Sequence, residues 1–183
     1  MLSLPLLLMA IATAAAPAAA QPAAPAQPPV RQQPIDEVAA DLAYGLCPLF
    51  LAGPFSLTGP ELAERGFGKT ITKLPHPRLG EMSTVTAKRP DGEIVFGGAA
   101  GKNCTVIVDT PQRAPVLARL HANMAFTGLG FKPVPNPGAS PEGLAVETFK
   151  APVDNQFLYL QLIQVGGPAG TGPVIAQLFG MDK

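Results

Sequence analysis

The chain lacks tryptophan and contains only two cysteines and two histidines among its 183 residues. A zinc site needs three or four clustered ligands, and these few residues show no metal-binding spacing. With two tyrosines and no tryptophan, no stacking platform for sugars or nucleic acid is evident. We therefore expect no cofactor, no metal and no nucleic-acid partner, and a binding protein rather than an enzyme.

Residues for nucleophilic or acid–base catalysis are also scarce. The G-x-S-x-G motif is absent, and the only imidazoles are His76, between two prolines, and His121, at the border of a helical apolar stripe. Asp109 ends a predicted strand and could work with either histidine, although we favour a role as a cap for the following turn. The alternative of a small periplasmic enzyme requires a histidine within about 4 Å of an acid in a cleft.

Two segments resemble a phosphate-binding loop but are incomplete. "AERGFGKT" (63–70) has Ala63 where the motif G-x-x-x-x-G-K-[ST] has its first glycine, and it follows a helix rather than a strand. "FGGAAGKN" (96–103) begins with Phe96 and lies between two predicted strands. Gly66 is better explained as the left-handed residue that ends a helix, and Phe67 as the apolar residue that packs back on it.

The N-terminus lacks charge, since no charged side chain occurs before Arg31. Its short apolar core, followed by Ala18-Ala19-Ala20, predicts a secretory signal peptide over residues 1–20. The alternative is an uncleaved membrane anchor, but eight of these 20 residues are alanine and the stretch is only weakly hydrophobic. Residues 21–34, rich in proline, alanine and glutamine, predict an unfolded spacer before a single domain over 35–183.

The two cysteines, Cys47 and Cys104, permit one internal pairing. In an exported chain an even cysteine count favours a disulfide over the alternative of two buried free thiols. A cross-link of this loop length stabilises a fold by roughly 4 kcal/mol in the chain-entropy model.

Three helices are expected. The first starts at Pro34 and carries an apolar stripe of Ile35, Val38, Leu42, Leu46 and Leu49, with Pro48 kinking or ending it. The second is a short helix introduced by a Thr58/Glu61 capping box. The third runs over about 114–127 and ends at Gly128; its buried stripe is expected to be Leu117, Leu120 and Met124, flanked by Val116.

The remaining periodic segments predict strands. They cover 81–88, 93–99, 103–109, 144–151, 157–165 and 174–180, with a short edge piece at 131–135. Tight turns such as "RPDG" (89–92) imply antiparallel pairing. We predict an α+β fold, in which an antiparallel sheet of about six strands carries two N-terminal helices and one mid-chain helix on one face. No repeat of fixed period is visible.

Charge is divided along the chain. Residues 34–64 carry five acids and no base, whereas residues 65–102 carry seven bases and three acids. The loop 66–80 holds Lys69, Lys73, His76 and Arg78 and is a candidate surface for an anionic partner, such as lipid head groups or a polymer. The alternative is a solvated face that pairs with the acidic helical region.

These features predict an exported, periplasmic or secreted protein of a bacterial envelope that acts as a non-catalytic binding or accessory domain. It would bind a partner protein of the envelope, a polymer or other anionic surface, or a small ligand, through its sheet edge or the loop 66–80. No membrane span would remain after signal cleavage. A purely structural envelope protein is a further alternative, and it predicts no concave pocket.

Overall fold

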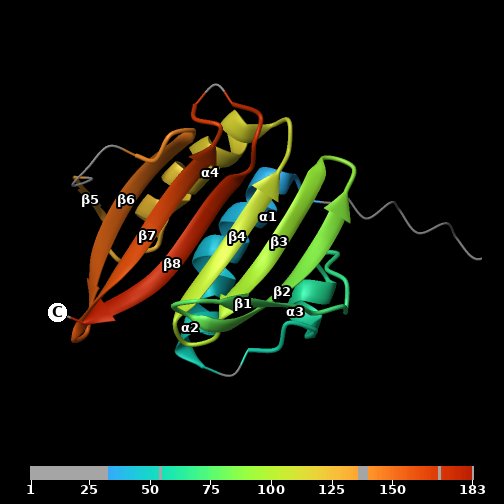
Figure 1. Cartoon of the computed structure of the whole chain (residues 1–183), viewed down its shortest axis with the longest axis horizontal. Helices are drawn as coiled ribbons and strands as arrows, with labels where there is room; N and C mark the ends of the chain where they lie inside the picture. The colour runs from blue at the N-terminus through green and yellow to red at the C-terminus, as the bar shows by residue number, and fades with distance from the viewer. Residues whose placement is uncertain (1–32, 54, 136–139, 169, 183) are drawn as a thin grey trace, which may run out of the picture. The chain divides into compact units, whose positions relative to one another are not determined.

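A single antiparallel sheet organises the described part of the chain (Figure 1). The computed structural model describes residues 33–53, 55–135, 140–168 and 170–182, all within one unit spanning Gln32–Lys183; the predicted signal peptide and most of the spacer lie outside it. The strands are β1 (Thr72–His76), β2 (Gly80–Arg89), β3 (Gly92–Ala99), β4 (Asn103–Asp109), β5 (Lys132–Val134), β6 (Leu144–Val153), β7 (Gln156–Val165) and β8 (Val174–Asp182). Their order across the sheet is β1-β2-β3-β4-β8-β7-β6-β5.

The predicted α+β class and antiparallel sheet are confirmed, but the strand number of about six is wrong, because the sheet has eight strands. The six predicted strands correspond to β2, β3, β4, β6, β7 and β8, and the predicted edge piece is β5. The remaining strand, β1, lies within the predicted loop 66–80 and is not predicted by the sequence. Its residues are mostly exposed and include Pro75, so it has no apolar alternation to indicate a strand.

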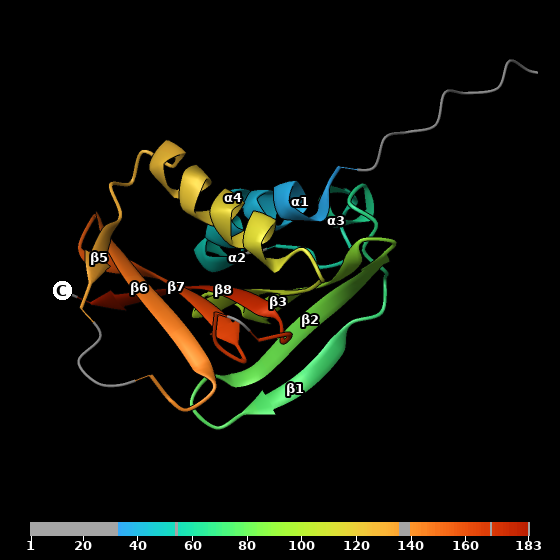
Figure 2. The ribbon, with the colours of Figure 1, turned by 90° about the horizontal axis from the view of Figure 1, so that it is seen from above.

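The helices lie together on one side of the sheet (Figure 2). They are α1 (Ile35–Asp41), the π-helical turn η1 (Leu42–Leu46), α2 (Cys47–Ala52), α3 (Pro60–Ala63) and α4 (Arg113–Phe126). The hydrophobic core fills the space between these helices and the sheet. No helix among the described residues is long and apolar enough to cross a membrane.

The first predicted helix does not end at Pro48 but changes its winding just before it. The chain continues past Pro48 to Ala52 through the π-helical turn, which precedes the proline that would otherwise interrupt the i→i−4 hydrogen bonds. A π-turn holds an extra residue and so rotates the helix face that follows it. Leu49 is consequently 56% exposed and was wrongly assigned to the buried stripe, whereas Cys47 is buried.

Two details of the other helices differ from expectation. The short helix α3 is preceded by Gly59, with no side-chain cap, so the Thr58/Glu61 capping box is wrong. In α4 the buried stripe is Val116, Leu120 and Met124, because Leu117 is only partly buried and flanks the stripe.

The end of α3 follows the expected pattern. Gly66 has a positive φ of 85°, and the Phe67 amide donates to the Leu62 carbonyl. The Phe67 side chain is buried against Phe96. The glycine and the aromatic residue of "AERGFGKT" therefore serve the helix end.

The disulfide Cys47–Cys104 is present as predicted. Cys47 begins α2 and Cys104 lies on the central strand β4, so the bond ties the helical layer to the middle of the sheet. Both cysteines are fully buried in the core.

The described fold consists of two halves with the same plan, a repeat that the sequence does not reveal. In each half a helix precedes four antiparallel strands, β1–β4 after α1–α2 and β5–β8 after α4. The halves join through β4 and β8, and the strand order runs outward identically on both sides. The hairpins β2–β3 and β6–β7 both close with a two-residue turn, between Arg89 and Gly92 and between Val153 and Gln156. This arrangement has an approximate two-fold axis between β4 and β8.

Candidate functional site on the open face of the sheet

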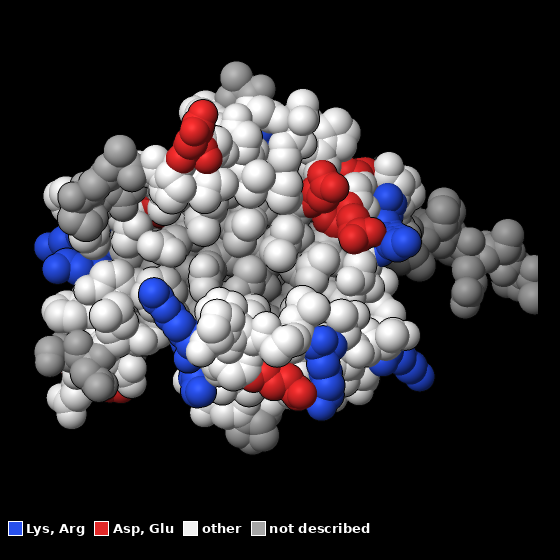
Figure 3. Space-filling view, viewed as in Figure 1, with Lys and Arg blue, Asp and Glu red and all other residues white. Residues whose placement is uncertain are grey.

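The sheet face opposite the helices is uncovered by any described helix, and it is the face seen in Figure 1. Alternate residues of each strand point to this face, because neighbours such as Val106 and Leu178 point into the core. Figure 3 shows the face to be hollowed at its centre, where charged side chains are absent, with charged groups along its rims.

A row of polar residues crosses the open face from strand to strand. Pairing links Thr84 of β2 to Gly97, Gly97 to Thr105, Thr105 to Gln177, Gln177 to Gln161 and Gln161 to Thr148 of β6. The row is symmetric about the Thr105–Gln177 pair, where the approximate two-fold axis passes, and Thr84 corresponds to Thr148. The Gln161 amide nitrogen donates to the Thr148 hydroxyl over 3.4 Å.

Gly97 is the one residue of this row without a side chain. Its φ is 146°, and a Cβ atom placed there would lie 2.1 Å from the Ser83 carbonyl oxygen of the neighbouring strand. The corresponding residue of the second half, Gln161, keeps a full side chain. A side chain at position 97 would therefore collide with the backbone of β2, so this position of the row carries glycine.

An aromatic group lies beside the polar row on the strands of the second half. The rings of Phe179 and Tyr159 stack with centroids 5.6 Å apart, and Phe157 contacts Tyr159 edge-on at 6.5 Å. The Lys150 ammonium lies 5.1 Å from the centre of the Phe157 ring. Composition gave no sign of this aromatic cluster, because only cross-strand pairing brings the rings together.

A depression of about 530 Å³ opens where the β1–β2 turn approaches the ends of the central strands. Its lining comes from the end of β1 and the β1–β2 turn, from the β3–β4 turn and the start of β4, and from the strands β7 and β8. The lining residues are His76, Arg78, Leu79, Gly101, Lys102, Asn103, Gln156, Gln161, Gln177, Phe179 and Gly180. This set contains two basic side chains, Arg78 and Lys102, and four side-chain amides, and none of these described residues is acidic.

Hydrogen bonds hold the rim of this depression. The His76 Nδ1 atom accepts from the backbone amides of Arg78 and Leu79, at 3.3 and 3.1 Å, which fixes the turn. The Lys102 ammonium donates to the Leu79 carbonyl at 3.1 Å and ties that turn to the β3–β4 turn. Buried Asn103 accepts from the Ala99 amide at 2.8 Å through its side-chain oxygen. These hydrogen bonds fix the backbone of the two turns that carry Arg78 and Lys102.

The structure divides the predicted partner loop. His76 and Arg78 line the depression, but Lys73 pairs with Glu81 across the β1–β2 hairpin at 2.8 Å and Lys69 is exposed elsewhere. Lys102 completes the site instead. Lys102 lies in the glycine-rich segment "FGGAAGKN" (96–103), which joins β3 to β4 and was noted in the sequence only as an incomplete phosphate-binding motif.

Part of the expected pairing between basic and acidic regions also occurs. Arg65 contacts Asp41 of α1, with 2.6 Å between the guanidinium and the carboxylate. Lys73 finds its acid within its own hairpin, however, and not in the acidic helical region. The alternative of a neutralised basic surface therefore applies to Arg65 and not to Arg78 or Lys102.

Asp109 is not close to either histidine. It lies at the opposite end of β4 from Asn103, which lines the depression with His76, and six residues of strand span about 20 Å. His121 contacts Glu147 at 3.3 Å, about 12 Å along α4 from Arg113 at the helix start. The depressions described here include neither His121 nor Glu147.

Asp109 does not cap the turn before α4 either. The residue before that helix is Gln112, without a side-chain cap, and Thr110 makes the local bonds. The Thr110 hydroxyl donates to the Asp91 carbonyl at 2.7 Å and accepts from the Gln112 amide at 3.1 Å. The predicted cap is therefore wrong by one position along the chain.

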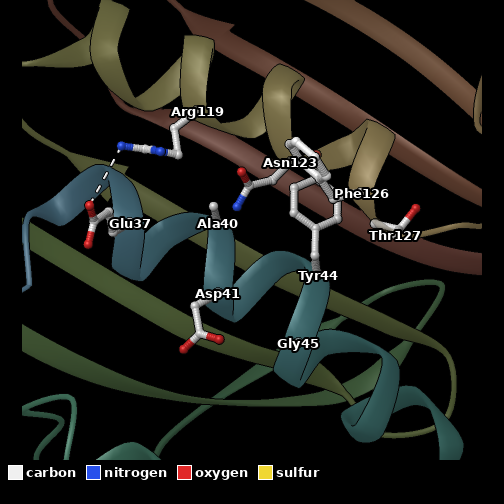
Figure 4. A pocket seen from close by; sticks show the side chains of 9 residues that line it. All are labelled: Glu37, Ala40, Asp41, Tyr44, Gly45, Arg119, Asn123, Phe126 and Thr127. Atoms are coloured by element: carbon white, nitrogen blue, oxygen red, sulfur yellow. Dashed lines mark ion pairs between the residues drawn. The ribbon is translucent and has the colours of Figure 1, made fainter.

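A second depression, of about 510 Å³, lies between α1–η1 and α4 on the helical side (Figure 4). Tyr44 lines it and donates from its hydroxyl to the Leu120 carbonyl at 2.7 Å; burial raises the pKa of Tyr44 well above its ordinary value. Its cation, Arg119, pairs with Glu37 and Asp36. The charges of this groove are therefore mutually satisfied, unlike those of the open-face depression.

Among the described residues, no three His, Cys, Asp or Glu side chains gather in a metal-binding cluster. Comparison of the chain with protein-family models, characterised proteins and solved structures finds no match. The chemistry of the open-face depression is therefore the basis on which a function can be argued.

Proposed function

We propose that this protein is an exported, non-catalytic binding domain of the bacterial envelope, and that it holds its ligand in the depression on the open face of the sheet. The observation that carries the proposal is the unbalanced lining, since Arg78 and Lys102 face a cavity with no acidic residue among its described walls. A concave site with a few convergent polar groups is the usual form of a ligand pocket, and about 530 Å³ lies within the usual range of roughly 300–1,000 Å³.

Three features support binding rather than catalysis at this place. The nearest imidazole, His76, uses Nδ1 to accept two backbone amides and so serves the turn. The floor of the depression, which we define by Gln161 and Gln177, carries amides, which donate and accept hydrogen bonds but do not transfer protons at neutral pH. The disulfide between the helical layer and β4 suits an oxidising compartment and supports export.

The experiment is to express the full chain in a Gram-negative host, purify the protein from the periplasm and record amide NMR spectra. The probe is the small-molecule fraction of a periplasmic extract. We expect N-terminal sequencing to start at Gln21, and the signals of Gln161, Gln177 and Lys102 to shift when the extract is added. Retention in the cytoplasm, or shifts confined to the α1–α4 groove, would contradict the proposal.

A further inference from the structure

The floor of the open-face depression is built to contact groups that both donate and accept hydrogen bonds. The Gln177 side chain, at the centre of the polar row, makes no side-chain hydrogen bond to another described residue, whereas the Gln161 side chain uses one amide hydrogen towards Thr148. A primary amide offers two donors and a carbonyl acceptor, which complement a hydroxyl group that donates once and accepts twice. Several hydroxyl groups on one ring would therefore match several amides on one floor.

The rim supplies uncompensated positive charge at one side of this floor. Arg78 has no acidic partner within the described ranges, and only one of the three ammonium donors of Lys102 is used, towards Leu79. A guanidinium and an ammonium that line the same depression favour an anionic group, because charge-assisted hydrogen bonds are the stronger ones. Carboxylate and phosphate oxygens both accept such hydrogen bonds.

An apolar element completes the lining. Phe179 lies next to Gln177 along β8, two residues apart on the same face, and is stacked against Tyr159. Its half-buried ring offers contact to the C–H groups of a sugar ring. A lipid chain would need a continuous apolar lining, whereas the amides of Gln156, Gln161 and Gln177 interrupt the apolar surface here.

We infer that the depression binds a sugar carrying one anionic group, either a sugar acid or a sugar phosphate. The inference rests on the proposed function and adds the ligand class. The anionic group contacts Arg78 and Lys102, the hydroxyl groups contact Gln161 and Gln177, and one face of the ring lies against Phe179.

The test uses four probes on the periplasmically purified protein, with binding measured by amide NMR titration. Glucuronate and glucose 6-phosphate carry the two anionic groups, glucose lacks charge, and inorganic phosphate lacks the ring. We expect at least one charged sugar to shift the Gln161 and Gln177 side-chain signals with an affinity at least tenfold above that of glucose and of phosphate. Whichever charged sugar binds identifies the anionic group.

Variants then assign the contacts. Arg78→Gln and Lys102→Gln should each weaken charged-sugar binding about tenfold, whereas Lys88→Gln, a matched removal of an exposed charge on the same sheet, should leave it unchanged. Gln177→Glu keeps the shape of the floor but places a negative charge in it, and should abolish binding. Unchanged melting temperatures show that each variant is folded.

The outcomes separate the two proposals. Equal binding of glucose and the charged sugars, or equal effects of Arg78→Gln and Lys88→Gln, would overturn the anionic-sugar inference. Absence of shifts with all four probes would overturn it as well. The proposed function survives either result if the periplasmic fraction still shifts the signals of the depression, and fails if it does not.

Discussion

The two halves of the described fold share a plan but differ in what lies between the helix and the first strand. In the second half α4 ends at Phe126 and β5 begins at Lys132, whereas in the first half α2 ends at Ala52 and β1 begins only at Thr72. The longer connection contains α3 and leads into the basic β1–β2 hairpin. The helices and strands common to both halves form the core. The longer connection of the first half leads into the β1–β2 turn, which forms the rim of the candidate site.

The depression therefore combines the two halves in different roles. The first half contributes the cationic turns with Arg78 and Lys102, and the second half contributes the amide and aromatic floor with Gln161 and Phe179. A symmetric molecule would carry the same groups on both sides of the axis. The differences between corresponding residues are thus the places where function and stability can be tested separately.

The largest expected effect concerns the disulfide, which only the first half has. Replacing both Cys47 and Cys104 with alanine should lower the free energy of unfolding by about 4 kcal/mol, because the bond constrains a long loop of the unfolded chain and is buried in the core. Urea unfolding of the oxidised protein and the double variant measures this loss.

Reduction of the wild-type protein is the matched control, since it opens the bond without removing the sulfur atoms. A loss below about 1 kcal/mol in both experiments would show that the first half does not depend on its covalent link to β4. The stability of the two halves would then come from packing alone.

The next effect tests the shared plan itself. Leu42 and Leu120 hold corresponding places in their helices, each following a buried valine by four residues, and are 0% and 1% exposed. Leu42→Ala and Leu120→Ala should each cost about 2–5 kcal/mol, because both leave a cavity between helix and sheet.

Chemical unfolding followed by circular dichroism should show one transition in each variant, because the halves share the core and the β4–β8 seam. Two separate transitions, or an effect of only one substitution, would mean that the halves are independent or unequal in packing.

A smaller effect separates the two corresponding hairpin turns. In the first half, Asp91 accepts from the Ile35 amide at 2.9 Å and pairs with Arg89 at 3.0 Å, thereby joining the β2–β3 turn to the start of α1. The other half has Asn155 in this position. Burial alone would raise the pKa of Asp91, but the hydrogen bond and charge of Arg89, together with backbone amides, outweigh it and hold the pKa below its usual value.

A lowered pKa in the folded state stabilises the fold above the unfolded pKa of about 3.9, and the contribution is lost as the pH falls through the folded value. Asp91→Asn should therefore destabilise the protein by about 1–2 kcal/mol at pH 7 and by much less near pH 2. Urea unfolding at the two pH values measures the difference, and Asn155→Asp serves as the control with little effect. A constant difference at both pH values would contradict the role of the Asp91 charge.

The sequence identified the strands whose apolar residues alternate or form continuous β-branched runs, because such residues must be buried. It did not identify β1, whose pairing with β2 depends on backbone bonds and not on burial. The exposure of Leu49 could not be predicted either, because the spacing of apolar residues does not indicate where a helix contains a π-helical turn. The two-fold plan was invisible because corresponding residues, such as Gly97 and Gln161, share a position and not a chemical type.

The sequence predicted only some residues of the candidate site, because the others come from segments that are far apart along the chain. A local cluster of bases in the sequence indicated His76 and Arg78, but Lys102 and the floor glutamines come from distant segments that only the strand order brings together. Lys69 and Lys73 belonged to the same local cluster, yet they do not line the depression. Sequence proximity therefore predicted the charge of the region and not which charges share a site.

The smallest expected effect distinguishes the paired lysine of the hairpin from the cations of the site. Lys73 and Glu81 are both well exposed, with 65% and 59% of their side chains accessible. Lys73→Gln should therefore change the free energy of unfolding by less than about 0.5 kcal/mol, because exposed ion pairs contribute little.

The same substitution should leave the NMR signals of Gln161 and Gln177 in place, since Lys73 does not line the depression. Thermal unfolding and one amide spectrum check both statements. A shift of the floor signals would mean that the β1–β2 hairpin moves as a unit when its ion pair is lost, and that the rim is held less firmly than the bonds of His76 and Lys102 imply.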